Sequence, residues 1–324
     1  MTDIAARIHA HGDAGVIRID ALHLAPPGPG EIQIRHTAIG VNFVDTYHRA
    51  GLYRLDLPAT LGVEGAGVVE AIGAGVEGLR VGQRIAYADP VPGAYATRRN
   101  LTAWRAVALP DEIDDERAAG AMLKGITAHM LFTHVRPLRP GDTLLVHAAA
   151  GGLGLVLVQW AKAMGARVIG TVGNRAKAEL ALAHGLDHAI LYREEDFVAA
   201  TLALTDGLGV HFAVDGIGAD TLPRTLAAVR PYGMAASVGQ VAGPLGDIDP
   251  AWLGPQRSIA LARPSVFRFM RDREAYLEGA AATMAQLRAG LRIHIGATLA
   301  LRDAAEAHCR LEAGDSSGVL LLRP

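Results

Sequence analysis

Between about residues 140 and 240 the chain alternates short apolar segments with helical ones, and this alternation constrains the fold more than any other feature. The intervening segments have the apolar spacing of helices of roughly ten to fifteen residues. Strands are predicted over Thr143–Ala149, Arg167–Val172, His188–Tyr192, Val210–Asp215 and Met234–Val238. Such alternation is typical of βαβ units, so the sequence predicts an α/β fold with a doubly wound parallel sheet.

The first predicted strand runs into a glycine-rich turn, Ala149-Ala-Gly-Gly-Leu-Gly154, and then into a helix. Such a turn is typical of dinucleotide sites, because the helix N-terminus presents free N–H groups and a positive dipole to the pyrophosphate. Alanine replaces the first glycine of the usual pattern. Gly151 would let the backbone approach the pyrophosphate, and Gly154 would let helix and strand pack closely. The turn therefore predicts a bound nicotinamide dinucleotide.

The end of the second strand indicates which nicotinamide cofactor is preferred. NAD sites usually carry an acidic residue there, which holds the ribose hydroxyls. This chain has none, and Asn174, Arg175 and Lys177 stand where a 2′-phosphate would lie. The alternative is that the two cations are ordinary solvated residues, although positive charge is mildly unfavourable at a helix start. The pattern favours NADPH.

The segments before and after this region are predicted to be rich in strands. Glu31–Arg35 alternates apolar and polar residues as a half-buried strand does. Near the C-terminus the pattern predicts a helix over Glu274–Ala289, a strand over Arg292–Ala297, a helix over Asp303–Leu311 and a strand over Gly318–Leu322.

Charge and cysteine content exclude several classes of protein. Lys and Arg number 31 and Asp and Glu 33, giving a net charge of −2, so the chain lacks the basic excess typical of nucleic-acid binding. The single cysteine, Cys309, excludes an internal disulfide framework and a four-cysteine zinc site. Residues 1–11 lack the apolar core of a secretory signal, and the uncharged stretch Leu144–Ala161 is interrupted by glycines. We expect a cytoplasmic protein without membrane insertion.

Five motifs are distributed along the chain: Ala38–Tyr47, Leu123–Thr127, His147–Gly154, Tyr192–Asp196 and Arg263-Pro-Ser265. Together they closely resemble the zinc-free quinone oxidoreductase (zeta-crystallin-like) family of the medium-chain dehydrogenases/reductases. The resemblance implies a GroES-like catalytic domain in two parts with a Rossmann nucleotide-binding domain inserted between them. The implied boundaries are 1–125 and 266–324 for the catalytic domain and 126–265 for the nucleotide-binding domain.

The resemblance also assigns roles to residues. Asn42, Asp45 and Thr127 would line the nicotinamide end of the cofactor, and Tyr47 and Tyr53 would face the substrate. The remaining residues implied to contact NADPH are Gly151, Gly152, Leu153 and Gly154 at the pyrophosphate, Gly173, Asn174, Arg175, Lys177 and Tyr192 at the adenosine phosphate, and Gly239, Gln240 and Arg263 near the nicotinamide ribose.

Structural alternatives exist for these residues. Asn42 and Asp45 could cap a helix beginning near Val44. Tyr47 and Tyr53 could be packing aromatics. Arg263 could hold a loop by binding carbonyl groups.

No catalytic metal is expected. In zinc-using relatives a cysteine ligand stands where this chain has Asn42, and Val63-Glu64 lacks the adjacent histidine. Without a Lewis acid, the enzyme needs an acceptor that is already electrophilic. We therefore expect hydride transfer from NADPH to a quinone, with protons from water or from a tyrosine such as Tyr47 or Tyr53.

Two other functions stay open. An alkenal or enone reductase would use the same motifs with a different pocket. A structural or RNA-binding role is the alternative from another class, although the cofactor turn and the near-neutral charge argue against it.

The family resemblance also implies a homodimer formed through the edge of the nucleotide-binding sheet.

Overall fold

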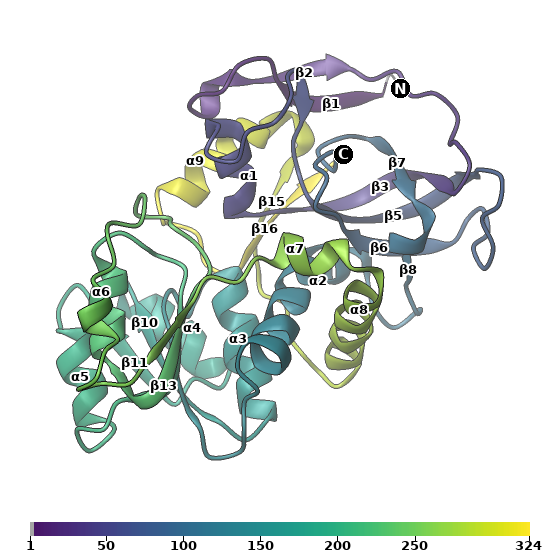
Figure 1. The fold of residues 1–324 in the computed structure, drawn as a ribbon. Coiled ribbons are helices and arrows are strands. Elements are labelled where there is room, and N and C mark those ends of the chain that lie inside the picture. Colours follow the sequence, from purple (N-terminus) through teal and green to yellow (C-terminus); the bar gives the residue numbers. More distant parts are fainter. Residues whose placement is uncertain (1–2) are drawn as a thin grey trace. The chain divides into compact units, whose positions relative to one another are not determined.

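The structure, a computed structural model, describes residues 3–324 and divides them into two compact units (Figure 1). One unit consists of the chain up to Ile126 together with Phe267–Pro324, and the other of Thr127–Val266. The expected boundaries, at 125/126 and 265/266, each lie one residue earlier. No helix among the described residues is long and apolar enough to cross a membrane.

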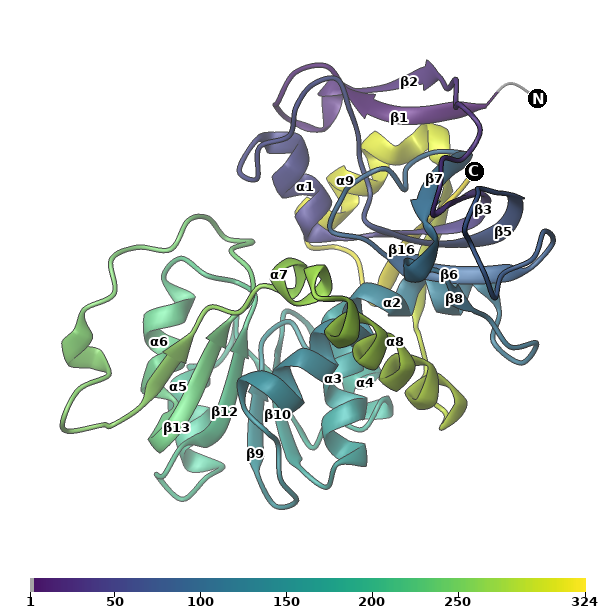
Figure 2. The ribbon, with the colours of Figure 1, turned by 45° about the vertical axis from the view of Figure 1, so that its right-hand side comes forward.

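The unit of Thr127–Val266 is built on a six-stranded parallel sheet, which agrees with the predicted doubly wound α/β fold (Figure 2). Its strands, in spatial order, are β11 (His188–Leu191), β10 (Arg167–Val172), β9 (Thr143–Val146), β12 (Val210–Asp215), β13 (Val229–Ser237) and β14 (Ala260–Ala262). The connecting helices are α3 (Gly152–Ala163), α4 (Arg175–Ala183), α5 (Phe197–Ala203) and α6 (Thr221–Ala227), and a π-helical segment covers Met130–Val135.

The strand order indicates where this sheet would bind a ligand. From β9 the chain proceeds outward to β10 and β11, and then returns to the other side of β9 for β12, β13 and β14. In open α/β sheets, ligands bind at the carboxyl ends of the strands where the order reverses. The turn after β9 lies at this position.

Three strands of this sheet differ from the prediction by more than one residue. β9 ends at Val146 rather than Ala149, because residues 147–150 form the turn before α3. β13 begins at Val229 rather than Met234, and β14 was not expected at all. Pro231 and Gly233 lie within β13 and are poor strand formers, so they conceal its first half in the sequence. The three residues of β14 are too few to show a periodic pattern.

The other unit is formed from both ends of the chain. A seven-stranded sheet joins β15 (Ile295–Ala300), β16 (Val319–Arg323), β3 (Glu31–Val41), β5 (Glu64–Ile72), β6 (Arg84–Ala88) and β8 (Val107–Ala108), with β7 (Arg98–Thr102) also paired to β3. A smaller sheet joins β2 (Ile17–Ala21), β1 (Ile4–Ile8) and β4 (Ala59–Thr60). Because β16 pairs with β3, the C-terminal strand completes the N-terminal sheet.

Helices complete this unit. They are α1 (Phe43–Ala50), α2 (Asp115–His129, whose last turn belongs to the other unit), α7 (Val266–Arg271, of which all but the first residue lies here), α8 (Arg273–Arg288) and α9 (Ala304–Glu312). α9 packs beside α1, which again joins the two ends of the chain (Figures 1 and 2). The strand expected over Arg292–Ala297 is β15, which starts at Ile295 because pairing with β16 begins there.

Candidate functional site

The turn between β9 and α3 offers backbone N–H groups to a ligand. Gly151 is the N-cap of α3, and the first N–H that bonds back into the helix is that of Leu155, which donates to the Gly151 carbonyl at 2.9 Å. The N–H groups of Gly152, Leu153 and Gly154 precede that bond and lie at the positive end of the helix dipole. This arrangement suits a bound phosphate.

Close packing at this turn requires glycine. A Cβ on Gly154 would lie 2.3 Å from the Ala148 carbonyl oxygen and 2.8 Å from the Ala149 Cα. Ala148 itself has a φ of 51°, which is uncommon for a residue with a side chain. The short separation of helix and strand keeps the N–H groups of the turn at a fixed position.

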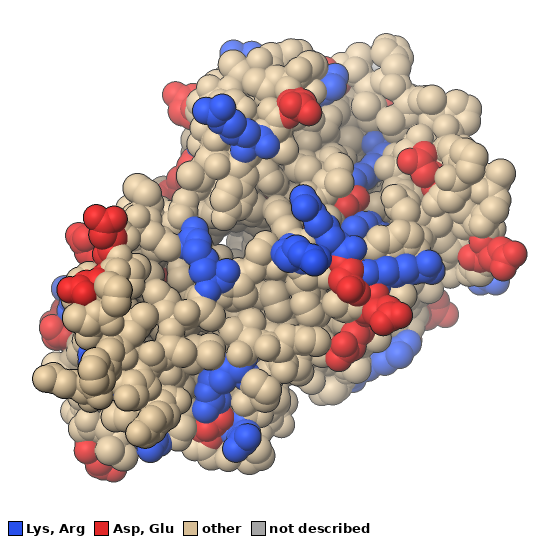
Figure 3. All heavy atoms as spheres, viewed as in Figure 1, with Lys and Arg blue, Asp and Glu red and all other residues tan. Residues whose placement is uncertain are grey.

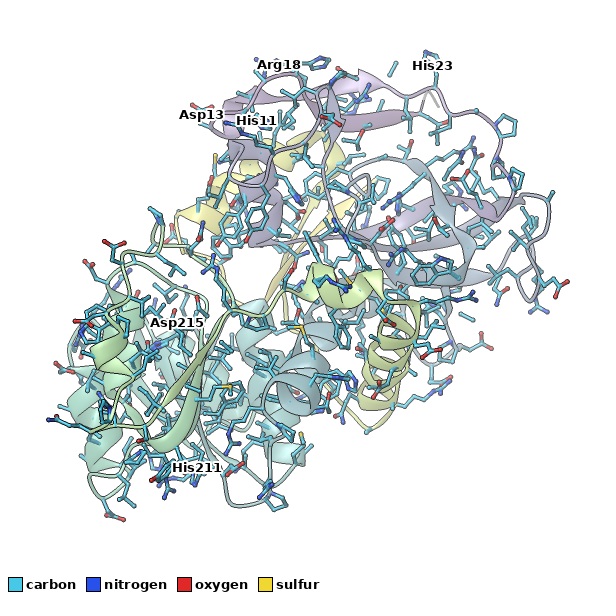
Figure 4. All side chains as sticks on the ribbon, in the orientation of Figure 1. His11, Asp13, Arg18, His23, His211 and Asp215 are labelled. Carbon is cyan, nitrogen blue, oxygen red and sulfur yellow. The ribbon has the colours of Figure 1, made fainter. Side chains whose placement is uncertain are left out.

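A buried hydrogen-bond chain secures the strand ends beside the turn. His147 lies between Thr171 Oγ1, 2.9 Å from Nδ1, and Thr225 Oγ1, 2.8 Å from Nε2. Thr225 in turn donates to Asp215 Oδ2 at 2.8 Å, and Asp215 ends β12 (Figure 4). Since that hydroxyl proton is used on Asp215, Nε2 of His147 is the protonated nitrogen and Nδ1 accepts from Thr171. Burial lowers the pKa of His147, which keeps the ring neutral.

The segment after β10 begins α4 with a side-chain cap. Asn174 Oδ1 accepts the backbone N–H of Lys177 at 2.9 Å, so this oxygen serves the helix. Arg175 is exposed, and Lys177 is half-buried in the first turn. The expected group of polar and basic residues therefore lies at one helix start.

A third cation at this place was missed in the sequence. The position a Cβ would take on Gly173 is 3.4 Å from the Tyr192 hydroxyl and 3.8 Å from the Arg193 guanidinium carbon. The same guanidinium carbon lies 5.9 Å from the centre of the Tyr192 ring. The sequence carried a signal for it, because Arg193 directly follows Tyr192 in the motif Tyr192–Asp196. Arg193 joins Arg175 and Lys177 as a candidate phosphate ligand.

The loop after β13 is held by Arg263. Its guanidinium donates to Ser237 Oγ at 3.2 Å and to Gln240 Oε1 at 2.9 Å. The loop-holding alternative for Arg263 is thus present, with side-chain oxygens as acceptors. Gly239 passes so close to Gly216 that a Cβ on it would lie 2.6 Å from the Gly216 carbonyl oxygen.

In the other unit, Asn42 belongs to a buried charged cluster with Glu64 and Lys124. Lys124 Nζ donates to Asn42 Oδ1 at 2.8 Å and to Glu64 Oε1 at 2.6 Å, and Asn42 Nδ2 donates to the same Glu64 oxygen at 2.8 Å. The second Glu64 oxygen accepts the backbone N–H of Leu123 at 2.7 Å. Glu64 and Lys124 were not predicted, because they are 60 residues apart and only the fold brings them together.

Asp45 is fully buried beside Asn42. Its Oδ2 accepts the backbone N–H of Asn42 at 2.8 Å and the Tyr95 hydroxyl at 3.1 Å, whereas Oδ1 has no partner. Asp45 therefore caps α1, as one alternative held. Burial is the main cause that raises the pKa of Asp45 to about 7.

Hydrogen bonds continue from Tyr95 toward the surface. The Tyr95 hydroxyl lies 3.1 Å from His308 Nε2, and Nδ1 of His308 lies 3.3 Å from Arg49 Nη1. Arg49 forms a two-bond ion pair with Glu312, at 2.7 and 2.9 Å. This chain ties α1 to α9.

Tyr47 and Tyr53 lie together near the end of α1. Their rings meet edge to face with centres 5.5 Å apart, and the Tyr53 ring also contacts that of His48. Tyr53 is 41% exposed, so part of this residue is open to a ligand or to water. Thr127, on α2, is buried and is the first residue of the other unit.

Comparison with known proteins identifies both parts of the chain. Residues 28–111 match the alcohol dehydrogenase GroES-like domain, and residues 152–286 match the zinc-binding dehydrogenase family. A quinone oxidoreductase of Pseudomonas aeruginosa is 41% identical over 97% of this chain and 98% of its own. A 2-haloacrylate reductase of a Burkholderia species is 38% identical over 99% of both chains. The solved structure of Escherichia coli quinone oxidoreductase complexed with NADPH superimposes with a TM-score of 0.95, at 37% identity, over 99% of this chain and all of that one.

The zinc in that family description does not fit the residues around Asn42. An amide oxygen and a carboxylate could bind a cation, but the Lys124 ammonium already lies 2.8 and 2.6 Å from them. A divalent ion there would face this buried positive charge. The cluster is therefore a place for an ammonium group and not for zinc.

Proposed function

We propose that this chain, which belongs to the quinone oxidoreductase family of the medium-chain dehydrogenases/reductases, is an NADPH-dependent quinone reductase that uses no metal. The observation that carries the choice of acceptor is the Lys124 ammonium, which already binds the two oxygens around Asn42 that could hold a metal, Asn42 Oδ1 and Glu64 Oε1. Without a Lewis acid an ordinary ketone is a poor hydride acceptor, whereas a quinone gains aromaticity on reduction.

The residues of the nucleotide-binding unit suit NADPH. We assign the pyrophosphate to the N–H groups of Gly152–Gly154, and the 2′-phosphate to Arg175, Lys177 and Arg193 with the Tyr192 hydroxyl. Arg263 fixes Gln240 and its loop for the ribose. The bound cofactor supplies a hydride. Thr127, Asn42 and Asp45 remain assigned to its nicotinamide end.

The reaction balances with one proton from outside the cofactor. NADPH, a quinone and one proton give NADP⁺ and a hydroquinone, because the hydride brings one hydrogen and both electrons. The proton comes from water or from Tyr47 or Tyr53. The protein contributes orientation and a fixed electrostatic environment more than acid–base chemistry.

A second candidate function is the reduction of an activated carbon–carbon double bond. The 2-haloacrylate reductase relative favours it, since that name describes an alkene conjugated to a carboxylate. Hydride addition to such a bond also places negative charge on a carbonyl or carboxylate oxygen. Both functions therefore require NADPH and a group that stabilises negative charge on an oxygen of the acceptor. They differ only in the acceptor.

A direct assay separates these functions. NADPH oxidation by the purified protein is followed with 1,4-benzoquinone and with a 2-alkenal, and NADH serves as control. Quinone turnover that requires NADPH supports the proposal, and alkenal turnover without quinone turnover replaces it with the second function. If both acceptors fail while NADPH binds, both proposals are wrong.

An RNA-binding role has little support from the surface. Acidic and basic side chains are mixed in small groups over the face in Figure 3, and the net charge is −2. Salt-sensitive retention on an RNA column would reopen this role.

We also propose a cytoplasmic homodimer that associates through the edge of the nucleotide-binding sheet. β14 is one of the two edge strands, and Tyr232 on the adjacent strand β13 is 89% exposed. Light scattering of the purified protein tests the dimer, and cell fractionation tests the location.

A further inference from the structure

The cluster of Asn42, Glu64 and Lys124 has only one consistent hydrogen-bond pattern. An ammonium group can only donate, and an ionised carboxylate can only accept. Lys124 therefore faces the amide oxygen of Asn42, and Glu64 faces the amide nitrogen, at 2.8 Å in each case. The orientation of the Asn42 amide follows from its two charged neighbours.

The cluster is buried and closely packed. The side chain of Glu64 is fully buried and that of Lys124 is 7% exposed. Gly40 makes room for the carboxylate, because a Cβ there would lie 2.4 Å from Glu64 Oε1. The backbone N–H of Leu123 fixes the other carboxylate oxygen at 2.7 Å. Glu64 therefore packs against β3 and is hydrogen-bonded by α2 and by Asn42.

Donors remain after these bonds are counted. The amide nitrogen of Asn42 carries two hydrogens and uses one on Glu64, and the ammonium of Lys124 carries three and uses two. Asn42 is 9% exposed, so the cluster is not wholly enclosed. A carbonyl oxygen that gains negative charge is the complementary group for such a donor.

We propose that Lys124 is a positioning residue, which together with Glu64 fixes the amide of Asn42 as a hydrogen-bond donor to the carbonyl oxygen of the hydride acceptor. Hydride addition moves an electron pair onto that oxygen, and the donor beside a fixed positive charge stabilises it until water supplies the proton. In this way the cluster stabilises the negative charge that a metal would stabilise in the zinc-using relatives. This inference rests on the proposed function.

The test measures how strongly the rate depends on the acceptor. For wild-type protein, log(kcat/KM) is determined for 1,4-benzoquinone and its methyl- and methoxy-substituted derivatives and plotted against their reduction potentials. Donor assistance matters most for the weakest acceptors. In Asn42→Ala and Lys124→Met we expect a steeper plot, with losses of about 100-fold for the weakest quinone and under tenfold for benzoquinone.

Two further variants keep the test informative. Lys124→Met leaves Glu64 unpaired and can fail to fold, so the double variant Lys124→Met/Glu64→Gln removes both charges at once. Lys162→Met is the matched control, because Lys162 also forms an ion pair, with Asp187 at 2.7 Å, but lies in the other unit. NADPH affinity is measured by fluorescence for all four variants, because Asn42 is also assigned to the nicotinamide end of the cofactor. It should stay unchanged in Lys162→Met, and a loss of affinity in the three cluster variants would not by itself steepen the plot.

The outcomes separate the inference from the function on which it rests. If wild type reduces quinones and the plots of Asn42→Ala and of the double variant run parallel to it, the donor role is wrong. If the variants lose NADPH affinity while their plots keep the wild-type slope, Asn42 serves only the cofactor and the inference is also wrong. If wild type reduces no acceptor at all, the proposed function itself is wrong.

Discussion

Two buried charged clusters in the same unit differ in what their donors bind. In the first, Asp89 accepts from Arg99 at 2.6 Å and lies 3.3 Å from Arg105, so two cations share one carboxylate. Arg105 also lies over the rings of Trp104 and Tyr276, with its guanidinium carbon 4.2 and 5.2 Å from their centres. The second is the cluster of Asn42, Glu64 and Lys124, in which one cation and one anion balance.

The surroundings explain the different purposes of the two clusters. Around Asp89 the guanidinium groups bond to backbone carbonyls, Arg99 to Val91 at 2.9 Å and Arg105 to Met270 at 3.2 Å. The Tyr276 hydroxyl donates back to the Arg105 carbonyl at 2.6 Å. The bonds of Arg105 with Met270 and Tyr276 join the N-terminal and C-terminal segments of this unit. The Asn42 cluster has N–H donors that form no bond within the cluster. We therefore expect substitution of Asp89 to lower the stability of the protein and substitution of Asn42 to lower the rate of quinone reduction.

The largest expected effect is that of Asp89→Asn on stability. It leaves two buried arginines without a counter-charge, and removing one partner of a buried pair costs about 3–5 kcal/mol. The shift of the urea midpoint measures this. Glu306→Gln is the control, because its pair with Arg310 is exposed and worth under about 1 kcal/mol. A loss in Asp89→Asn no larger than in the control would break the comparison.

A third group of cations sharpens the comparison, because its members are accessible and would bind a ligand. Lys177→Ala and Arg193→Ala should each weaken the binding of NADPH by about 1.5–3 kcal/mol, which is the contribution of a charged hydrogen bond. The affinity for NADH should stay unchanged. Fluorescence titration with the two cofactors measures the difference. Equal losses for both cofactors would contradict the assignment of the 2′-phosphate.

The pH dependence of stability tests Asp45, which adjoins the Asn42 cluster. Since the pKa of Asp45 rises from 3.8 to about 7 on folding, the folded protein holds a proton that the unfolded chain releases. The stability this gives is present at low pH and is lost as the pH rises toward 7. Tyr95, Glu64 and Lys124 also act on Asp45 but do not cancel the effect of burial.

Asp45→Asn removes this dependence. Relative to wild type, the variant should gain about 1–3 kcal/mol in stability between pH 5 and pH 7.5. Urea midpoints of both proteins at the two pH values give the change, and the difference cancels the contribution of the buried histidines. A constant difference would mean that Asp45 is ionised at both pH values.

The sequence predicts elements better than it predicts partners. Arg167–Val172 and Val210–Asp215 match β10 and β12 because strands buried on both faces are continuous apolar runs. Asp45 and Tyr95 are 50 residues apart, and Tyr95 and His308 are 213 apart, so no local pattern connects them. A family motif supplied Asn42, and the basic residues after the second predicted strand supplied Lys177. The partners of Asn42 are Glu64 on β5 and Lys124 on α2, and only the fold brings them to it.

The smallest expected effect is on the tyrosines, which separate proton donation from hydride activation. Tyr53 is exposed, so water can replace its hydroxyl as the proton source. We therefore expect Tyr47→Phe and Tyr53→Phe to lower quinone turnover by less than about threefold, well below the 100-fold or more typical of a lost general acid. The kcat of each variant with 1,4-benzoquinone measures this. A loss of about 100-fold in either would make that tyrosine the proton donor, and activation would then be shared with the Asn42 cluster.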